Sequence, residues 1–421
     1  MPFLDILPSM RHAATPRLDP AVWSHTTHVD HAGRLTIGGV ACADIADECG
    51  TPAFVLDEAD FRRRARRYRK ELPGTNVVYA GKALLTTGVA RWAAEEHLGV
   101  DVCSGAELAI ALAGHVPAGR IVYHGKDFGA AKTDEELAAA VDAGVGRIVV
   151  HSLRDVTSLA GLGRKPQNVL VRSAPDAENS RQVIARIMAE PTLRLVGLHC
   201  HLGSQVCDAG QYAEAVARMI VAMADVRRAH RVVLGELNIG GGHGVPCVSG
   251  DPELKLRELA SCVDDALDHT CAAERFPRPT IVVEPGRGLC ARAGVTLHRV
   301  HSVQSLPTGR KVAVDGVALH GARHTATLAN RRPLGPSDVM AVGPSGAEME
   351  LPADIGAGDL IAVACTGAYQ LNGPPLVAVR DGKFFDVDSA SIDPPVRRSA
   401  GPRPSLTASQ SRAAFHPDFR R

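Results

Sequence analysis

The chain has 421 residues, which is more than one ordinary domain needs and enough for a barrel followed by a smaller domain. Lys and Arg total 47 and Asp and Glu total 46, so no overall charge steers the protein toward nucleic acid or an anionic membrane. The hydrophobic share of 45% is typical of a soluble globular protein. No apolar run reaches about 18 residues, so the sequence predicts no membrane span.

Cysteine use and the amino-terminal residues predict a cytoplasmic protein. Ten cysteines are scattered without CxxC pairs, which favours reduced thiols over a disulfide framework. Residues 1–30 lack an apolar core flanked by basic residues and a cleavage site, so they do not resemble a secretory signal. The basic run at 62–70 is predicted to be the solvated face of a helix rather than a nucleic-acid patch.

Short apolar runs alternate with longer amphipathic runs over residues 51–290. The predicted strands are 77–79, 100–102, 121–123, 147–150, 169–171, 195–198, 236–238 and 280–283. The predicted helices between them are 87–97, 106–113, 134–143, 179–189, 213–230 and 254–273. Eight strands separated by helices predict an α/β fold, a (β/α)8 TIM barrel.

The pattern changes after the eighth strand. Apolar runs at 295–303, 311–314, 360–363 and 376–380 are separated by Gly and Pro turns without helical spacers. They predict an antiparallel β-barrel or sandwich domain over 291–392. Residues 1–50 are expected to contribute strands to this domain, near 35–37, with a further strand near 54–56. Pro, Ser and Arg dominate 393–421, which is predicted to be a flexible tail.

Polar residues follow five of the predicted barrel strands, where barrel enzymes place their chemistry. Lys82 follows the first strand, and Ser104 and Glu107 follow the second, which contains Asp101. The remaining three sets follow strands six to eight. They are His199, His201 and Ser204; Gly240, Gly241 and Gly242; and Glu284, Gly286 and Arg287. We expect these residues to meet at one mouth of the barrel.

These residue types suit pyridoxal 5'-phosphate. A lysine amine forms a Schiff base with an aldehyde. A carboxylate such as Glu284 would keep a pyridine nitrogen protonated, so that the ring accepts electrons. The flat ring of His201 could stack on the cofactor. Backbone N–H groups of the glycine run, with Arg287 and Ser204, would hold the phosphate.

Each motif also has an ordinary structural interpretation. A lysine after a strand is usually a surface residue, and both a triple glycine and Glu-Pro-Gly-Arg are common turns. The glycine run is not the spaced fingerprint of dinucleotide sites. His199 and His201 could be taken for metal ligands, but on a strand they share a face without a third and fourth ligand nearby, so no metal is predicted. One of these histidines is expected to be packed or hydrogen-bonded.

Taken together, the motifs resemble those of the fold-type III pyridoxal-phosphate decarboxylases, and among them the diaminopimelate decarboxylases. The resemblance covers about residues 48–385. The similar stretches are Gly50-Thr51-Pro52, Tyr79-Ala80-Gly81-Lys82-Ala83, Asp101-Val102-Cys103-Ser104-Gly105-Ala106-Glu107-Leu108, Leu198-His199-Cys200-His201-Leu202-Gly203-Ser204-Gln205, Glu284-Pro285-Gly286-Arg287 and Thr366-Gly367-Ala368-Tyr369. The resemblance implies the alanine racemase/decarboxylase architecture and a homodimer.

The resemblance also implies roles for residues. Lys82 would carry the cofactor covalently and His201 would stack on its ring, and these two are the expected catalytic residues. Arg287 would also bind the substrate carboxylate. The expected cofactor-binding residues are Lys82, Asp101, His201, Ser204, Gly240, Gly241, Gly242, Glu284, Gly286, Arg287 and Tyr369.

The chain departs from the family pattern where the substrate binds. The family segment Asp-Asn-Pro-Arg-Pro-Ala-Leu-Tyr-Gly-Ala is replaced by 314–322, which lacks the arginine and has His320 in place of tyrosine. The Cys-Glu-Ser-Gly-Asp segment, which reaches the neighbouring subunit's site, is reduced to 342–346. Its proton-returning cysteine and its glutamate are missing. His320 is expected at the substrate, and Cys365 or His320 could replace the acid, unless they are a core thiol and a rim histidine.

The expected reaction is decarboxylation of an amino acid. In the family this converts meso-diaminopimelate to L-lysine and carbon dioxide, and here it could be retuned to another amino acid or conjugate. An alanine-racemase-like isomerase is one alternative, although its tyrosine base cannot be placed in this sequence. A catalytically impaired cofactor-binding protein is the other.

Overall fold

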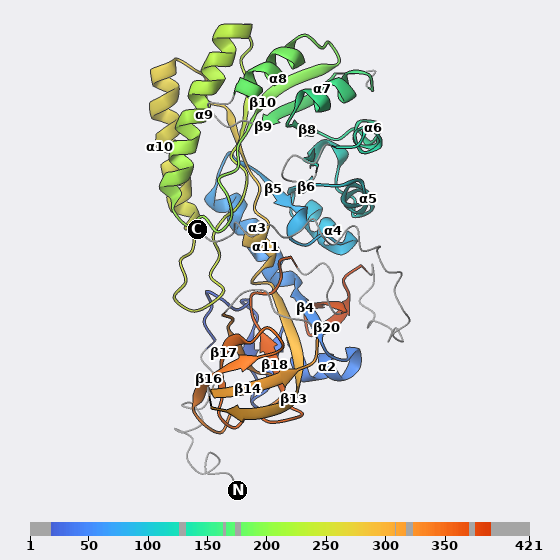
Figure 1. Cartoon of the computed structure of the whole chain (residues 1–421), viewed down its shortest axis with the longest axis vertical. Helices are drawn as coiled ribbons and strands as arrows, with labels where there is room; N and C mark the ends of the chain where they lie inside the picture. Colours follow the sequence, from blue (N-terminus) through green and yellow to red (C-terminus); the bar gives the residue numbers. More distant parts are fainter. Residues whose placement is uncertain are drawn as a thin grey trace.

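The computed structural model describes residues 18–125, 132–162, 166–172, 178–307, 309–316, 323–369 and 375–388. Figure 1 shows an elongated molecule, with a barrel at one end of the long axis and a β domain at the other. None of the helices in these ranges combines the length and apolar character that a membrane crossing requires.

The strands of the barrel are all parallel and close on themselves, which confirms the predicted (β/α)8 barrel. They are β5 (Asn76–Ala80), β6 (Gly99–Val102), β7 (Ile121–Tyr123), β8 (Arg147–Val150), β9 (Gln167–Arg172), β10 (Leu193–His199), β11 (Glu236–Asn238) and β12 (Thr280–Val283). Closure comes from β12 pairing with β5, where Val283 lies opposite Val77.

Helices and short turns separate these strands and form the outer layer seen in Figure 1. They are η2 (Gly81–Ala83), α4 (Thr87–Glu95), α5 (Gly105–Ala113), η3 (Ala118–Arg120), α6 (Asp134–Ala143), α7 (Leu153–Ala160), α8 (Glu178–Met188), α9 (Ala209–His230) and α10 (Leu256–Glu274). Several begin at a hydroxyl side chain that accepts an amide hydrogen bond, which fixes where the helix starts. Those caps are Thr86, Ser104, Thr133 and Ser152.

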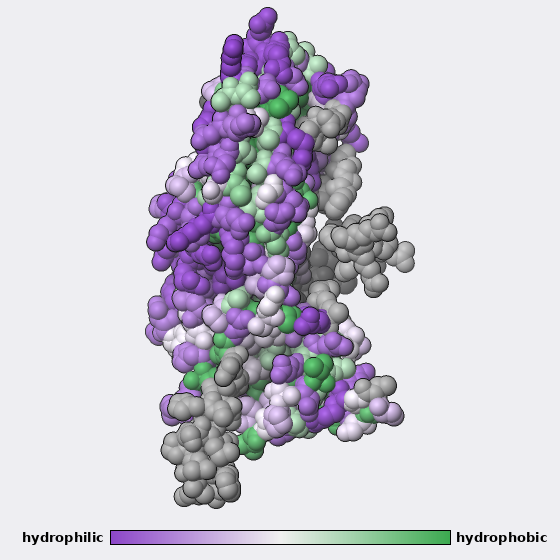
Figure 2. Space-filling model, turned by 90° about the vertical axis from the view of Figure 1, so that its left-hand side faces the viewer, coloured by the Kyte–Doolittle hydropathy of each residue, from purple (hydrophilic) through white to green (hydrophobic). Residues whose placement is uncertain are grey.

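The basic run lies on α3 (Glu58–Glu71), so a helix forms there as expected, but the prediction that its face is solvated is wrong in part. Arg64 is buried and bonds Asp60 at 2.6 Å. Arg62 bonds Glu58 at 2.7 Å. These two arginines pair with carboxylates of the same helix, whereas Arg63, Arg66, Arg69 and Lys70 are exposed as predicted. Figure 2 shows hydrophilic residues predominating over the barrel half on the face it presents.

Apolar side chains fill the barrel interior in one layer, and a polar layer lies above it. The apolar layer is Val78, Val122, Val149, Leu170 and Val282. Alternate residues of a strand point to the same side, so the residue two positions later also points inward. That rule brings His124 and Glu284 into the interior toward the carboxyl ends of the strands, and both are buried.

The second domain is built on a nine-stranded sheet with β17-β16-β14-β13-β4-β19-β20 in order, and β18 pairs with β13 and carries β15 on its other side. Its strands are β4 (Ala53–Asp57), β13 (Gly294–Leu306), β14 (Gly309–Val314), β15 (Ala326–Leu328), β16 (Ser337–Val342), β17 (Ala347–Pro352), β18 (Leu360–Val363), β19 (Leu376–Arg380) and β20 (Lys383–Asp386). Most pairs are antiparallel, as predicted, whereas β14–β16 and β4–β19 are parallel.

The amino-terminal part adds a small sheet to this domain. The strand expected near 35–37 is β2 (Leu35–Ile37), and it pairs with β1 (His28–Val29) and β3 (Val40–Ala41), not with the large sheet. The helix α2 (Cys42–Cys49) directly follows β3. The small sheet nevertheless packs on the β domain, since the Leu35 amide donates to the Ala329 carbonyl at 3.0 Å and both side chains share one apolar core. The expected tail at 393–421 lies outside the described residues.

Candidate active site

Lys82 lies in the η2 turn directly after β5, at the carboxyl end of the barrel. The loop after β12 approaches it closely, because a Cβ on Gly286 would lie 2.9 Å from that of Ala83 and 3.1 Å from that of Ala80. The β domain reaches the same turn, since the Tyr369 amide donates to the Ala83 carbonyl at 2.6 Å. The first strand, the eighth strand and the β domain therefore meet at the lysine.

The glycine run after β11 forms a turn beside His201. Gly242 has φ +79°, and a Cβ there would lie 1.9 Å from the Gly203 carbonyl oxygen, so only glycine fits. A Cβ on Gly240 would lie 3.1 Å from Nδ1 of His201. Tyr212 fixes the turn from below by donating to the Gly241 carbonyl at 2.9 Å. The loops after β10 and β11 are therefore in contact, as the sequence predicts.

Arg287 connects three parts of the mouth. It begins α11 (Arg287–Cys290) after β12, and its Nη2 donates to Oγ of Ser204 at 3.1 Å. Its guanidinium carbon lies 5.2 Å from the ring centroid of Tyr369, which is 44% exposed. A guanidinium, a hydroxyl and a phenol at an open rim are donors suited to a phosphate or carboxylate.

Glu284 is the centre of a buried polar cluster that the sequence did not predict. Its side chain is buried and accepts from His124 Nε2 at 2.9 Å, His199 Nε2 at 3.2 Å and Asn238 Nδ2 at 2.6 Å. The Asn238 Oδ1 in turn accepts from the Gly240 amide at 2.8 Å. The hydrogen bonds thus fix the position of the carboxylate, and Asn238 also fixes the glycine turn.

The charges in this cluster are set by one another. Burial would raise the pKa of Glu284, but His124 and His199 hold it well below its usual range. Burial would lower the pKa of His124, but Glu284 and Asp101 raise it. Asp101 is buried beside the Glu284 anion, and its pKa rises to about 7. The geometry therefore favours an anionic Glu284 paired with a cationic His124.

His201 is neutral at physiological pH, because burial and the nearby Lys82 cation lower its pKa to about 4. Burial likewise lowers the pKa of His199 to about 4. Of the two histidines, His199 is the hydrogen-bonded one. The reason for excluding a metal at His199, the lack of neighbouring ligands, is wrong, since ligand atoms of His124, His199 and Glu284 lie within 4.8 Å of one another. Both histidines bond Glu284 instead, and His201 is not among these three residues.

The remaining residues that the sequence suggested for the site make no contact with the Glu284 cluster among the described hydrogen bonds. Ser104 and Glu107 begin α5, where Ser104 caps the helix and Glu107 accepts from the Cys103 amide at 2.6 Å. Cys365 follows β18, and its Sγ lies 3.4 Å from Sγ of Cys247. His320 lies outside the described residues.

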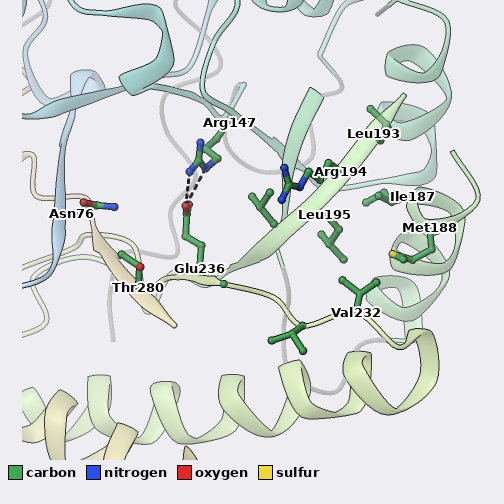
Figure 3. A pocket seen from close by; sticks show the side chains of 13 residues that line it. Asn76, Arg147, Ile187, Met188, Leu193, Arg194, Leu195, Val232, Glu236 and Thr280 are labelled. Atoms are coloured by element: carbon green, nitrogen blue, oxygen red, sulfur yellow. Dashed lines mark hydrogen bonds and ion pairs between the residues drawn. The ribbon is translucent and has the colours of Figure 1, made fainter. Parts of the chain in front are cut away.

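A cavity of about 620 Å³ lies at the opposite end of the barrel (Figure 3). Its lining includes Asn76, Arg147, Glu236 and Thr280, and each of these residues begins a barrel strand. Arg147 and Glu236 form an ion pair at 2.9 Å within it. Because Lys82 follows the end of its strand, this cavity is not part of the mouth.

His243 follows the glycine turn and makes the stability of the site dependent on pH. It is buried, it stacks on Tyr68 with centroids 5.6 Å apart, and its Nδ1 bonds the Tyr68 hydroxyl at 2.9 Å. Burial lowers its pKa to about 4. A lowered histidine pKa gives stability that is present above pH 6.5 and lost as the pH falls toward 4.

We expect His243→Gln to flatten this acid dependence. For the cofactor-free protein, the unfolding free energy between pH 6.5 and 4 should fall less steeply in the variant, by about 1.4 kcal/mol per pH unit at most. Denaturant unfolding at several pH values measures the slope, which is independent of any constant loss from the substitution. Parallel slopes for the two proteins would show that His243 does not take up a proton on unfolding.

A (β/α)8 barrel joined to a β domain, with a lysine, a buried carboxylate and a glycine turn at one mouth, defines a class of cofactor-dependent enzymes. The chain belongs to the pyridoxal-dependent decarboxylases, because the model of their pyridoxal-binding domain matches residues 58–185 and 178–291. It is a pyridoxal-phosphate-dependent carboxy-lyase that resembles diaminopimelate decarboxylase.

Named relatives and solved structures agree with this placement. Diaminopimelate decarboxylase of Actinosynnema pretiosum subsp. auranticum is 38% identical over 91% of this chain and 96% of its own length. The Mycobacterium tuberculosis (strain H37Rv) enzyme is 35% identical over 87% and 94%. The structure of diaminopimelate decarboxylase from M. jannaschii with L-lysine shares the fold, with a TM-score of 0.78, 23% identity, and coverage of 86% of this chain and 95% of that chain.

The residues at the mouth fit pyridoxal phosphate. A neutral flat imidazole, a buried anionic carboxylate and a glycine turn that has no side chains to keep an anion away match the ring, its nitrogen and the phosphate. When bound, the cofactor supplies an electron sink for the pair left on Cα by the departing carboxylate.

Proposed function

We propose that the chain releases carbon dioxide from the α-carbon of an amino acid, with Lys82 as the residue that carries the cofactor. The lysine amine would hold the cofactor until the substrate amine displaces it. His201 would lie on the ring, and Glu284 would keep the pyridine nitrogen protonated. The observation that carries this proposal is the anionic carboxylate held by three hydrogen bonds at the same mouth as the lysine.

We assign the anion-binding role to the rim. Ser204, Arg287 and the glycine turn would bind the phosphate, with Tyr369 closing over it from the β domain. Asp101 would support the cluster around Glu284, since its Oδ2 lies 4.0 Å from Nε2 of His124. Arg287 would also face the substrate carboxylate.

The hairpin between β16 and β17 supports a changed substrate. Val342 lies opposite Ala347, so Gly343, Pro344, Ser345 and Gly346 form a tight turn without an acidic or thiol side chain. We propose that the enzyme no longer grips the distal amino-acid group of meso-diaminopimelate through this segment. Its preferred substrate would be another amino acid or an amino-acid conjugate.

A panel of substrates tests both parts of the proposal. Purified protein with added pyridoxal phosphate is given meso-diaminopimelate, lysine, ornithine and acyl-linked amino acids, and carbon dioxide is measured. We expect release from at least one compound, with kcat/KM for meso-diaminopimelate lower than for the best substrate. If meso-diaminopimelate is the best substrate, the proposed change of specificity is wrong. If no compound releases carbon dioxide, the proposed decarboxylation is wrong.

We also propose a cytoplasmic homodimer. Leu334 and Val339 lie before and within β16 and are 64% and 66% exposed, which leaves apolar side chains beside the hairpin for a second copy to cover. Light scattering of the purified protein measures the mass. A monomer at micromolar concentration would contradict this arrangement.

A further inference from the structure

Two thiols from different domains meet beside the mouth. Cys247 belongs to the loop between β11 and α10, and Cys365 follows β18. Their sulfur atoms lie 3.4 Å apart although the residues are 118 positions apart in sequence. A disulfide needs the sulfurs at about 2.05 Å, so a small movement would suffice to join them.

One contact joins the β domain to the loop of Cys247 independently of the sulfurs. Thr325 of the β domain donates its hydroxyl to the Cys247 carbonyl at 3.1 Å. Sγ of Cys365 also lies 3.4 Å from the Pro246 carbonyl oxygen. Cys365 itself has φ +58°, a left-handed conformation that its surroundings must impose. The two thiols are therefore close to each other because the β domain packs on the loop after β11.

The two thiols differ in reactivity. The hydrogen bond with Cys365 lowers the pKa of Cys247 to about 7, and the positive charge of Arg287 contributes in the same direction. The same hydrogen bond and burial raise the pKa of Cys365. Cys247 is half-buried and reachable from solvent, and a thiolate is the nucleophilic form of cysteine. Cys247 is thus suited to react first and Cys365 to resolve the product.

We propose that Cys247 and Cys365 form a reversible disulfide that ties the loop after β11 to the β domain at the edge of the active-site mouth. With a hydroperoxide as oxidant, the Cys247 thiolate attacks the terminal peroxide oxygen and the O–O bond breaks. This step gives a sulfenic acid and an alkoxide or hydroxide, which takes a proton from solvent and leaves as an alcohol or water. The Cys365 thiol then attacks the Cys247 sulfur, the S–O bond breaks and water leaves. The peroxide is reduced, two thiols are oxidised, and a dithiol reductant reverses the change.

The bond would have a structural consequence at the mouth. The loop that contains Cys247 begins at the glycine turn, and Arg287 is close enough to act on the Cys247 charge. A bridge to Cys365, four positions before Tyr369, would fix the two walls of the mouth relative to each other. A cross-link that closes a long loop also restricts the unfolded chain, so it should raise the melting temperature by a few degrees.

The test uses the full chain and hydrogen peroxide at a low molar excess. Intact mass should show the loss of two hydrogen atoms, thiol titration should show two fewer thiols, and peptide mapping should join the peptides of Cys247 and Cys365. Dithiothreitol should restore the original mass and melting temperature. Cys247→Ser and Cys365→Ser should each abolish the joined peptide and the thermal shift.

Cys207→Ser is the matched control, because Cys207 is also half-buried and packs on the same loop through the Pro252 carbonyl at 3.5 Å. This variant should form the disulfide as the unmodified chain does. Oxidation of Cys247 to a sulfinic acid without a joined peptide would overturn the proposal. So would oxidation confined to other cysteines, and the unmodified chain alone suffices for that observation if a variant folds poorly.

Discussion

Replacing Lys82 with alanine should reduce carbon dioxide release on the best substrate by on the order of 10³-fold or more, because the variant loses the amine that carries the cofactor. The visible absorbance of the cofactor–lysine linkage should disappear as well. Steady-state kinetics and an absorbance spectrum of the purified variant check the two expectations.

Lys255→Ala serves as the control for Lys82→Ala. Lys255 is 63% exposed and bonds Glu253 at 3.2 Å, so its loss should leave activity and absorbance unchanged. A Lys82→Ala protein that keeps both the absorbance and most of the activity would show that another lysine carries the cofactor.

Glu284→Gln should lower kcat by about 10²-fold or more, because an amide cannot keep the pyridine nitrogen protonated and the electron sink weakens. The substitution keeps the size of the side chain and its hydrogen bond from Asn238, so the cofactor should still bind. The kinetics measure the loss, and a spectral shift of the bound cofactor would report the changed protonation of the ring.

Glu236→Gln is a matched control for Glu284→Gln. Glu236 is also a glutamate that lies inside the barrel, but it begins β11 at the opposite end and pairs with Arg147. The Glu236→Gln substitution should lower the stability of the protein but leave the spectrum of the bound cofactor unchanged. Equal losses of kcat in the two variants would mean that Glu284 acts only through the fold.

The barrel could be predicted from the sequence because its strands are short apolar runs. The runs at 121–123, 147–150, 236–238 and 280–283 coincide with β7, β8, β11 and β12. β9 and β10 extend further than predicted because Gln167 and Arg194 pair within the sheet despite their polarity. The helix α7 was missed because it is only eight residues long, although Ser152 gives it a capping signal.

The β domain was only partly predictable. β16 and β17 were missed because neither is a continuous apolar run. In β17, exposed Glu348 and Glu350 alternate with buried residues, the pattern of a half-buried strand, and β16 is stabilised by pairing with β17. β15 and β20 are three and four residues long and carry little pattern of their own. Such strands depend on partners that are distant in the sequence.

The residues of the mouth were predicted from motifs, but the partners of Glu284 were not. His124 and His199 lie 160 and 85 positions from Glu284, so no local spacing connects them. One signal was available: His124 and Glu284 each stand two positions after an inward-pointing valine, Val122 and Val282. Strand alternation would have connected His124 and Glu284 but not His199, because a register shift between Leu195 and Gly197 interrupts it in β10.

Borohydride reduction of the purified protein, followed by digestion and peptide mass mapping, shows which lysine carries the cofactor. Reduction makes a Schiff base permanent, so we expect one pyridoxyl group, on the peptide that contains Lys82. A cofactor fixed on another lysine, such as Lys132, or a protein saturated with pyridoxal phosphate that shows no fixed group, would contradict the account.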